Sequence, residues 1–281
     1  MIKQRPLGLT IVAYAGYVLL FLFFILPILT ILSLSLKTPA EIFSPATIRN
    51  LIPENPTLDN YKTVMVNVRM NVYILNSAKL VISTVLGVLI ISSLSSYALS
   101  RFHFRKKNLM ILIILMFQMI SPIVIGIPLY WYYSRLHLLD TYFGLAIAYI
   151  AIQLPFATFL LKGVFDGIPV EMDEAAKIDG CSRLMTLIKV ILPVSLPGIA
   201  SAIIFLSINA WSQFVLPFFL LNKDQMYPVS VGILLSQGTF KDISTHYVAA
   251  ASMIGLLPAV ILVLFLQKFI LKALLSGAVK G

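Results

Sequence analysis

Six long stretches of this sequence contain no aspartate, glutamate, lysine or arginine. They are Leu7–Leu36, Leu80–Ser100, Asn108–Ser134, Thr141–Leu161, Val190–Asn222 and Ile243–Gln267. A helix needs about 20 mainly apolar residues to cross the hydrocarbon core of a bilayer, and each stretch meets this requirement. The sequence therefore predicts an all-α polytopic membrane protein with six transmembrane helices.

The expected spans cover residues 11–35, 77–100, 108–132, 141–162, 198–221 and 247–270 within a single transmembrane domain, residues 1–281. The first stretch is longer than the apolar region of a signal peptide, so we expect it to be retained as a helix. Two connections, 37–76 and 163–197, exceed what a helical hairpin needs. Long connections between otherwise short-looped helices commonly carry function.

Composition and charge agree with a bilayer environment. The chain is 59% hydrophobic and 11% charged, whereas a soluble domain carries about 25% charged residues. A formal net charge of +10 would suggest nucleic-acid binding in a soluble protein. Here the basic residues gather before the first span, after the last, and in the connections that follow the second and fourth spans. This pattern predicts that both termini and 163–197 are cytoplasmic, that 37–76 is extracytoplasmic, and that nucleic acid is not a partner.

The sequence contains no recognisable catalytic motif. A single cysteine, Cys181, excludes an intrachain disulfide, and the three histidines are scattered, so we expect no metal site. There is no phosphate-binding G-x-x-x-x-G-K-[ST] loop, so we expect no ATP to bind here in the P-loop manner. Ionisable groups inside a bilayer cost about 2.5–3.5 kcal/mol each, and the six stretches lack strongly ionisable residues. The chain suits a path for a neutral polar solute better than a proton relay or an intramembrane acid–base enzyme.

Uncharged polar side chains within the spans are the candidate lining of such a path. They are Gln118, Ser121, Gln153, Asn209, Ser212 and Gln213, and the aromatic rings of Trp211 and Tyr130 could stack on a sugar. The same side chains can instead join neighbouring helices by hydrogen bonds or anchor the span ends at the membrane interface, and both interpretations remain open. Kinks at Pro122, Pro128, Pro155 and Pro258 are also expected to shape a site or a gate.

The interior connection 163–197 has the sequence of two short helices. Pro169 and the acids that follow it favour a helix start, and Gly180 supplies the left-handed residue that ends the helix. Ser182 is suited to cap a second helix, which we expect Pro193 to end. From the residues alone, the first helix is either an interfacial amphipathic helix or a surface for a partner.

The segment Glu174-Ala-Ala-x-x-Asp-Gly180, followed by Leu192-Pro193 and Pro197, resembles the EAA loop of ABC importer permeases. In that family the loop forms a coupling helix that docks in a cleft of a cytoplasmic ATPase subunit. The resemblance implies ATPase-coupling roles for Glu174, Ala175, Ala176, Asp179, Gly180, Leu192 and Pro193. Members of the family often have alanine at the position of Cys181 and phenylalanine at that of Leu187.

Further motifs resemble the carbohydrate branch of the family, specifically the second permease of maltose-type systems. They are Thr57-Leu-Asp-Asn-Tyr61, Asn76-Ser77, Tyr97-Ala-Leu-Ser-Arg-Phe-His-Phe104, Ile127-Pro-Leu-Tyr130, Leu154-Pro-Phe156 and Gly277-Ala-Val-Lys-Gly281. The fifth span departs from the pattern, because Ala210-Trp-Ser-Gln-Phe214 stands where similar proteins often read Ala-Trp-Asn-Glu-Phe.

The resemblance implies a permease subunit of type I importer architecture in a bacterial or archaeal cell (inner) membrane. It would pair with a homologous but distinct permease, receive a carbohydrate from an extracytoplasmic solute-binding protein, and couple to two copies of a cytoplasmic ABC ATPase. The chain itself would be non-catalytic and bind no cofactor, since ATP and Mg are used by the ATPase. The alternatives are an ABC permease for another solute, such as an amino acid, peptide or polyamine, a self-sufficient secondary transporter or channel, and a membrane enzyme.

Overall fold

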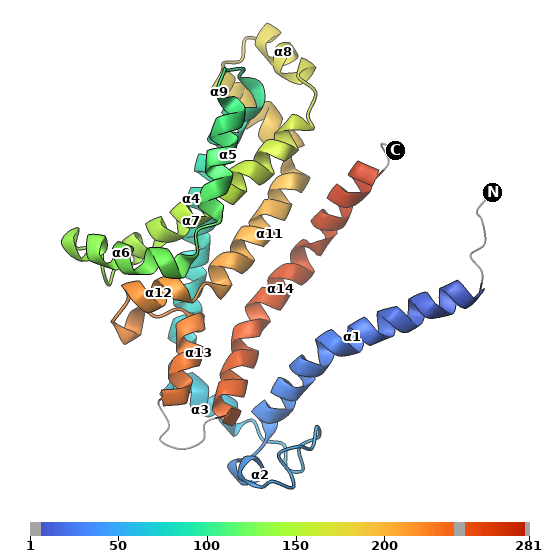
Figure 1. The fold of residues 1–281 in the computed structure, drawn as a ribbon, viewed down its shortest axis with the longest axis vertical. Helices are drawn as coiled ribbons and strands as arrows, with labels where there is room; N and C mark the ends of the chain where they lie inside the picture. Colours follow the sequence, from blue (N-terminus) through green and yellow to red (C-terminus); the bar gives the residue numbers. More distant parts are fainter. Residues whose placement is uncertain (1–6, 239–244, 279–281) are drawn as a thin grey trace. The chain divides into compact units, whose positions relative to one another are not determined.

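The computed structural model describes residues 7–238 and 245–278, and every regular element in these ranges is helical (Figure 1). Four helices are long and apolar enough to cross a membrane: Val12–Leu36, Met70–Arg101, Tyr142–Asp166 and Thr245–Phe265. Two further pairs of helices are sharply bent, and the total reaches six if each pair is one span. The all-helical class is confirmed, and the range of four to six candidate spans includes the six that the sequence predicts.

The chain divides into two compact units, which are described separately. One comprises Met1–Met70 and Gly232–Leu256, and the other comprises Asn71–Val231 and Leu257–Gly281. Helices α13 (Val229–Gly238) and α14 (Thr245–Ala278) each contribute to both units.

The first unit contains a small ordered cap at the end of α1 (Leu7–Leu36), built with α2 (Pro39–Phe43) and α3 (Asp59–Asn67). At its centre lies Lys37, whose side chain is 1% exposed. The ammonium group donates to the carbonyl oxygens of Thr47, Ile48 and Asn50 at 2.6–2.9 Å. Three carbonyl acceptors compensate for the cost of burying this charge, so the loop closes around one side chain.

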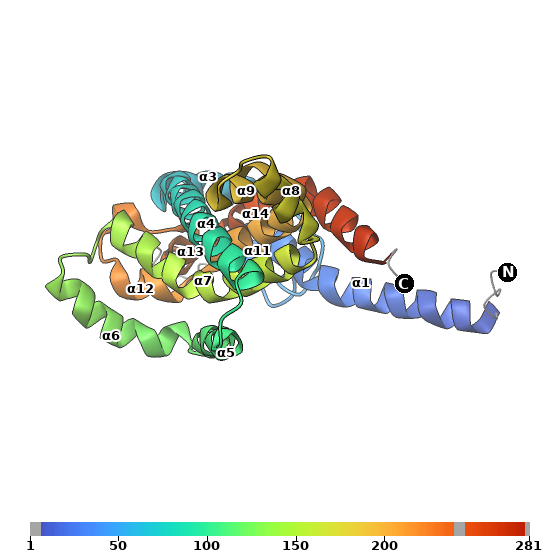
Figure 2. The same ribbon diagram turned by 90° about the horizontal axis from the view of Figure 1, so that it is seen from above.

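The second unit is built on three helices that pack side by side: α4 (Met70–Arg101), α7 (Tyr142–Asp166) and α11 (Leu196–Ser212) (Figure 2). The other helical elements that lie wholly in this unit are α5 (Lys107–Gln118), α6 (Pro122–Arg135), α8 (Glu171–Ile178), α9 (Arg183–Thr186), the π-helix η1 (Leu187–Ile191), α10 (Leu192–Val194), α12 (Val215–Leu220) and the 3-10 helix η2 (Asp224–Met226). Its apolar core includes Val88, Leu145 and Leu206, one from each of the three central helices. In Figure 1, α8 lies at one end of this unit.

The third charge-free stretch is broken rather than straight. Helices α5 and α6 meet at 88° across Met119–Ser121. Pro122 explains the break, because a proline disfavours helical backbone at the residue before it, and Ser121 is extended at φ −65° and ψ 136°. The Ser121 hydroxyl also accepts a hydrogen bond from the backbone N–H of Ile123, which caps the new helix. Pro128, Pro155 and Pro258 lie inside continuous helices.

The fifth stretch is interrupted at both ends of α11. The expected span 198–221 is not one helix, because α11 ends at Ser212 and α12 begins at Val215. At the other end, the helical segment Arg183–Val194 meets α11 at 82°. The sequence predicts that this segment ends at Pro193, and it ends one residue later, at Val194. A proline normally clashes with the carbonyl four residues earlier, and the wider turns of η1 directly before Pro193 allow the last turn to include it.

The connection 37–76 is shorter than the sequence suggested. Helix α4 begins at Met70, so its first two turns lie in the range that the sequence predicts to be a loop. Asn76 and Ser77, near the predicted start of the second span, are buried within the protein. The Asn76 amide donates to the carbonyls of Gln225 and Tyr227, and the Ser77 hydroxyl accepts from Val229 N–H at 2.8 Å. Internal partners allow these polar residues to lie inside a helix.

Helices α7 and α11 approach closely at Gly198. A Cβ atom added there would lie 2.5 Å from Val164 Cγ1 and 2.6 Å from Cγ2. Valine has a stiff branched side chain and cannot move aside easily. Only a residue without a side chain fits this contact.

We predict that Gly198→Ala lowers the thermal stability of the purified protein in detergent, because overpacking a close contact typically costs about 1–3 kcal/mol. Adding Val164→Ala should restore most of the lost stability by removing the clashing methyl groups. The control is Gly163→Ala on α7, where an added Cβ meets nothing within 4 Å. Equal melting temperatures for Gly198→Ala and the control would contradict the close packing.

Candidate functional site

The predicted helix–glycine–helix segment is present. Helix α8 covers Glu171–Ile178, and three acids lie in its first turn, as its dipole favours. Gly180 has φ +81°, the left-handed conformation expected at the end of a helix. Ser182 then caps α9, because its hydroxyl accepts from the backbone N–H of Met185 at 3.3 Å. Local chemistry therefore fixes both the end of α8 and the start of the next helix.

The two faces of α8 differ sharply. One face is exposed and carries Glu171, Glu174, Ala175 and Ile178, whose side chain is 88% exposed. These positions follow the helical spacing of three and four residues, so they form one continuous surface, which we call the exposed face of α8. Ala176 is buried on the other side of the helix, so Ala175 and Ala176 do not share one exposed patch.

The opposite face of α8 is held by a buried ion pair. The Asp173 carboxylate accepts from Arg101 Nε at 2.8 Å, and the two side chains are 6% and 7% exposed. The second Asp173 oxygen accepts from the Tyr97 hydroxyl at 2.7 Å. An apolar cluster that includes Phe165 and Leu187 lies beside them. The Tyr97–Phe104 motif was recognised in the sequence, but its contact with Asp173 was not predicted. The one signal in the sequence for Asp173 was an acid on the inner face of a predicted helix.

The remaining coupling candidates lie elsewhere on the segment. Asp179 and Gly180 are exposed at the end of α8. Leu192 packs against the apolar cluster beneath α8. Leu192 and Pro193 also line an apolar groove of about 590 Å³ between α4 and the η1–α11 segment. The structure therefore does not bring these two residues onto the exposed face of α8.

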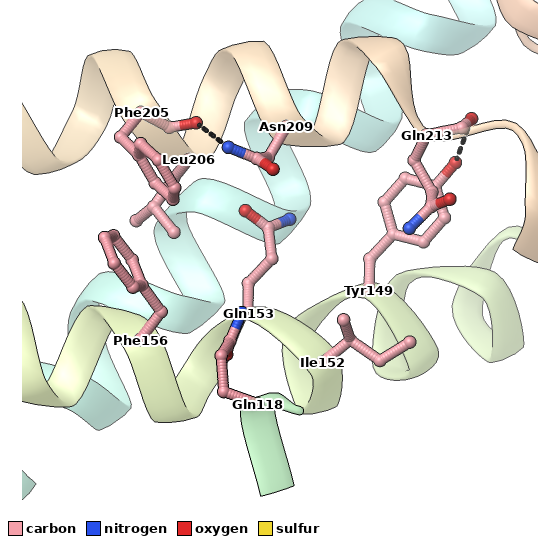
Figure 3. Close-up of a pocket in the computed structure, with 9 residues that line it drawn as sticks. All are labelled: Gln118, Tyr149, Ile152, Gln153, Phe156, Phe205, Leu206, Asn209 and Gln213. Carbon is pink, nitrogen blue, oxygen red and sulfur yellow. Dashed lines mark hydrogen bonds between the residues drawn. The ribbon is translucent and has the colours of Figure 1, made fainter. Parts of the chain in front are cut away.

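Four of the predicted path residues meet around one small cavity of about 60 Å³ (Figure 3). Gln153 comes from α7 and points toward Asn209 on α11, while Gln118 enters from the end of α5 and Gln213 follows the end of α11. Gln118 lies at the break between α5 and α6, and Gln213 lies at the break between α11 and α12. Each break therefore allows an amide side chain at a helix end to reach the cavity.

The polar atoms of this cavity are unequally satisfied. Asn209 Nδ2 donates to the Phe205 carbonyl at 3.0 Å, and Gln213 Oε1 accepts from Val215 N–H at 3.2 Å. Gln153 Oε1 is buried and has no hydrogen-bond partner among the described residues. A buried acceptor without a partner is costly, so Gln153 is the side chain best placed to bind a polar group that enters the cavity.

Aromatic residues that were not among the predicted path residues also line the cavity. Phe156 and Phe205 stack with ring centroids 4.2 Å apart, and the buried Tyr149 donates its hydroxyl to the Gln213 carbonyl at 3.3 Å. Tyr149, Gln153 and Phe156 follow a helical spacing of four and three residues, and Phe205, Asn209 and Gln213 follow one of four. Aromatic residues at helical spacing from Gln153 and Asn209 were the signal that could have indicated them.

Three predicted path residues do not line the cavity. Ser121 caps α6, and the Ser212 hydroxyl donates to the Ile208 carbonyl at 2.9 Å. Trp211 packs against the apolar core and lines a different, apolar hollow. The nine residues that line the amide cavity include no aspartate, glutamate, lysine or arginine. In the described ranges no three histidine, cysteine or acidic side chains come together as ligands for a metal ion.

The chain is similar in sequence to known permease proteins of transport systems. The chain is 31% identical to the sulfoquinovosyl glycerol transport system permease protein SmoH of Agrobacterium fabrum, over 91% of this chain and 88% of that one. It is 34% identical to the trehalose/maltose transport system permease protein MalG of Thermococcus litoralis, over 82% and 84%. It is 29% identical to the arabinooligosaccharides transport system permease protein AraQ of Bacillus subtilis, over 94% of both chains.

The fold has a counterpart among solved structures. A chain of a bacterial ABC transporter involved in the import of the acidic polysaccharide alginate superimposes with a TM-score of 0.79, covering 95% of this chain and 99% of that one at 22% identity. The family model for the inner membrane component of binding-protein-dependent transport systems matches residues 87–276. That range contains α8, both broken helix pairs and the amide cavity, and the chain belongs to this family of inner membrane transport components.

Proposed function

We propose that this chain is the permease subunit of an ATP-driven carbohydrate importer and that the amide cavity forms part of the wall of the translocation path. The cavity carries this proposal because its chemistry matches a sugar. Amides both donate and accept hydrogen bonds, as sugar hydroxyls require, and the Phe156–Phe205 pair offers an apolar aromatic surface. The relatives named above are permeases for sugar-containing solutes.

The size of the cavity supports pairing with a second permease. At about 60 Å³ it is far smaller than the roughly 300–1,000 Å³ of typical ligand pockets. This chain alone therefore supplies one wall of a site and does not enclose a sugar. A homologous but distinct permease would supply the opposite wall, and an extracytoplasmic solute-binding protein would deliver the solute.

The exposed face of α8 is the surface on which we expect an ATPase subunit to dock. Glu174, Ala175 and Ile178 give it an acid, a small residue and an exposed apolar side chain. With one such helix on each permease, two copies of the ATPase would bind, and these would use ATP and Mg. Docking requires α8 to be cytoplasmic, so both termini are cytoplasmic as well if there are six spans. Closure of the ATPases would then move α8, and the translocation path would open in turn to each side of the membrane.

The composition of the isolated complex tests this proposal. We expect the tagged chain, purified from its native membrane in mild detergent, to retain a second permease and a P-loop ATPase, identified by mass spectrometry. Reconstituted with its binding protein, the complex should take up a carbohydrate only when ATP is supplied. Uptake by this chain alone would contradict the proposal and favour a secondary transporter. ATP-dependent uptake of an amino acid or peptide instead would support an ABC importer but contradict a carbohydrate as its solute.

We predict that Gln153→Leu reduces carbohydrate uptake roughly fivefold, because one hydrogen bond to the solute contributes about 1 kcal/mol. The melting temperature should not fall, since the substitution removes a buried acceptor that has no partner among the described residues. The matched control is Ser201→Ala on α11, whose hydroxyl donates to the Pro197 carbonyl at 3.2 Å, away from the cavity. Unchanged uptake by Gln153→Leu would place the solute path elsewhere.

We also predict that Gly180→Val weakens solute-stimulated ATP hydrolysis in the reconstituted complex. A Cβ at this position would meet nothing within 4 Å, so the cost arises from the positive φ and not from crowding. Valine strains this conformation, whereas asparagine tolerates it, so Gly180→Asn should retain more of the hydrolysis. If both variants behave like the wild-type complex, the end of α8 is not part of the coupling surface.

A further inference from the structure

Asp173 is fully engaged by a single neighbouring helix. Its two carboxylate oxygens accept from Arg101 Nε at 2.8 Å and from the Tyr97 hydroxyl at 2.7 Å. Tyr97 and Arg101 lie four residues apart and therefore on the same face of α4. The buried face of α8 is thus attached to the last turn of α4 through one carboxylate.

Arg101 also binds the end of α7. Its Nη1 donates to the Phe165 carbonyl at 3.1 Å, and its Nη2 donates to the Ile168 carbonyl at 3.0 Å. Phe165 lies in the last turn of α7, where carbonyl groups have no partner within the helix and attract a cation. One planar guanidinium group therefore joins three elements: α4, which carries it, the end of α7, and α8.

A second set of contacts strengthens the same junction. The Ser100 hydroxyl donates to the Asp166 carboxylate at 2.7 Å, and Lys162 forms an ion pair with the other Asp166 oxygen. The Ser100 contact again joins the ends of α4 and α7, while the Lys162 ion pair lies within α7 and holds the Asp166 carboxylate in place. Because α7 is continuous from Tyr142 to Asp166, it connects this junction to Tyr149 and Gln153 in the amide cavity.

We infer that Arg101 is a positioning residue that ties α8 rigidly to α4 and α7, so that a displacement of α8 by the ATPase reaches the amide cavity. This inference rests on the proposed function of α8 as the ATPase-docking helix. A buried ion pair with satisfied hydrogen bonds holds one geometry, because any relative movement of α8 would leave a charge without a partner. The exposed face stays free for docking, while the opposite face transmits the movement.

The test is the number of solute molecules taken up per ATP hydrolysed by the full reconstituted complex with its binding protein. Arg101→Lys keeps the positive charge but cannot span the carboxylate and two carbonyls with one compact ammonium group. We expect this ratio to fall roughly fivefold or more, the lower end of typical coupling between sites. Asp173→Asn removes the charge from the other side of the pair and should act in the same direction.

Tyr97→Phe is a milder variant that still tests the inference if the complex carrying Arg101→Lys does not assemble. It removes only the hydroxyl group that binds Asp173, and we expect the transport ratio to fall by a smaller factor. Combining Tyr97→Phe with Asp173→Asn should lower the ratio little further than Asp173→Asn alone, since both act on the same contact. The matched control is Arg105→Gln, which removes an exposed positive charge just beyond the same end of α4.

The outcomes separate this inference from the proposed function. If the wild-type complex shows no ATP-dependent uptake, the proposed function fails before the junction is tested by any variant. If the wild-type complex is coupled and Tyr97→Phe, Asp173→Asn and Arg101→Lys keep its transport ratio, the inference is overturned. An equal fall in Arg105→Gln also overturns it, because the effect would then reflect surface charge. Reduced amounts of complex with an unchanged ratio would assign the ion pair a purely structural role.

Discussion

A peptide group in the hydrocarbon core of a membrane has no water to bind, so a chain of membrane-spanning helices must repair every interruption with its own groups. The break before α6 is repaired by the Ser121 hydroxyl. The break after α11 is repaired by the Gln213 side chain, which accepts from Val215 N–H, and by two hydroxyl groups that donate to the Gln213 carbonyl. The amide cavity exists because these repaired breaks lie beside α7.

The same requirement explains three polar side chains that the protein buries away from the cavity. Lys37 gathers three carbonyls of its loop, Asn76 binds two carbonyls, and Arg101 binds a carboxylate and two carbonyls. In each case one side chain donates hydrogen bonds to backbone carbonyls that lack a partner within a regular helix. A largely apolar chain therefore uses charged and amide side chains to form hydrogen bonds with backbone carbonyls that lie outside its regular helices or at their ends.

Local chemistry was predictable from the sequence, and long-range pairing was not. The helical class, the end of α8 at Gly180 and the cap at Ser182 follow from helix rules that involve neighbouring residues only. The Arg101–Asp173 pair joins residues 72 positions apart, and no periodicity links them. Gln153, Asn209 and Ser212 were predicted on the same ground, as polar residues within spans, but only Gln153 and Asn209 line the amide cavity. The π-helix η1 directly before Pro193 was also not predicted, because such a helix has no reliable local signature.

The way Gln213 is held has a consequence for how such permeases diverge. Its side chain serves the fold only as an acceptor for Val215 N–H, and a carboxylate oxygen can accept that bond equally well. Glutamine and glutamate are therefore interchangeable for the backbone at this position, while they differ by a full negative charge beside the cavity. A single substitution here can therefore change the charge beside the amide cavity and keep the hydrogen bond that satisfies the helix break.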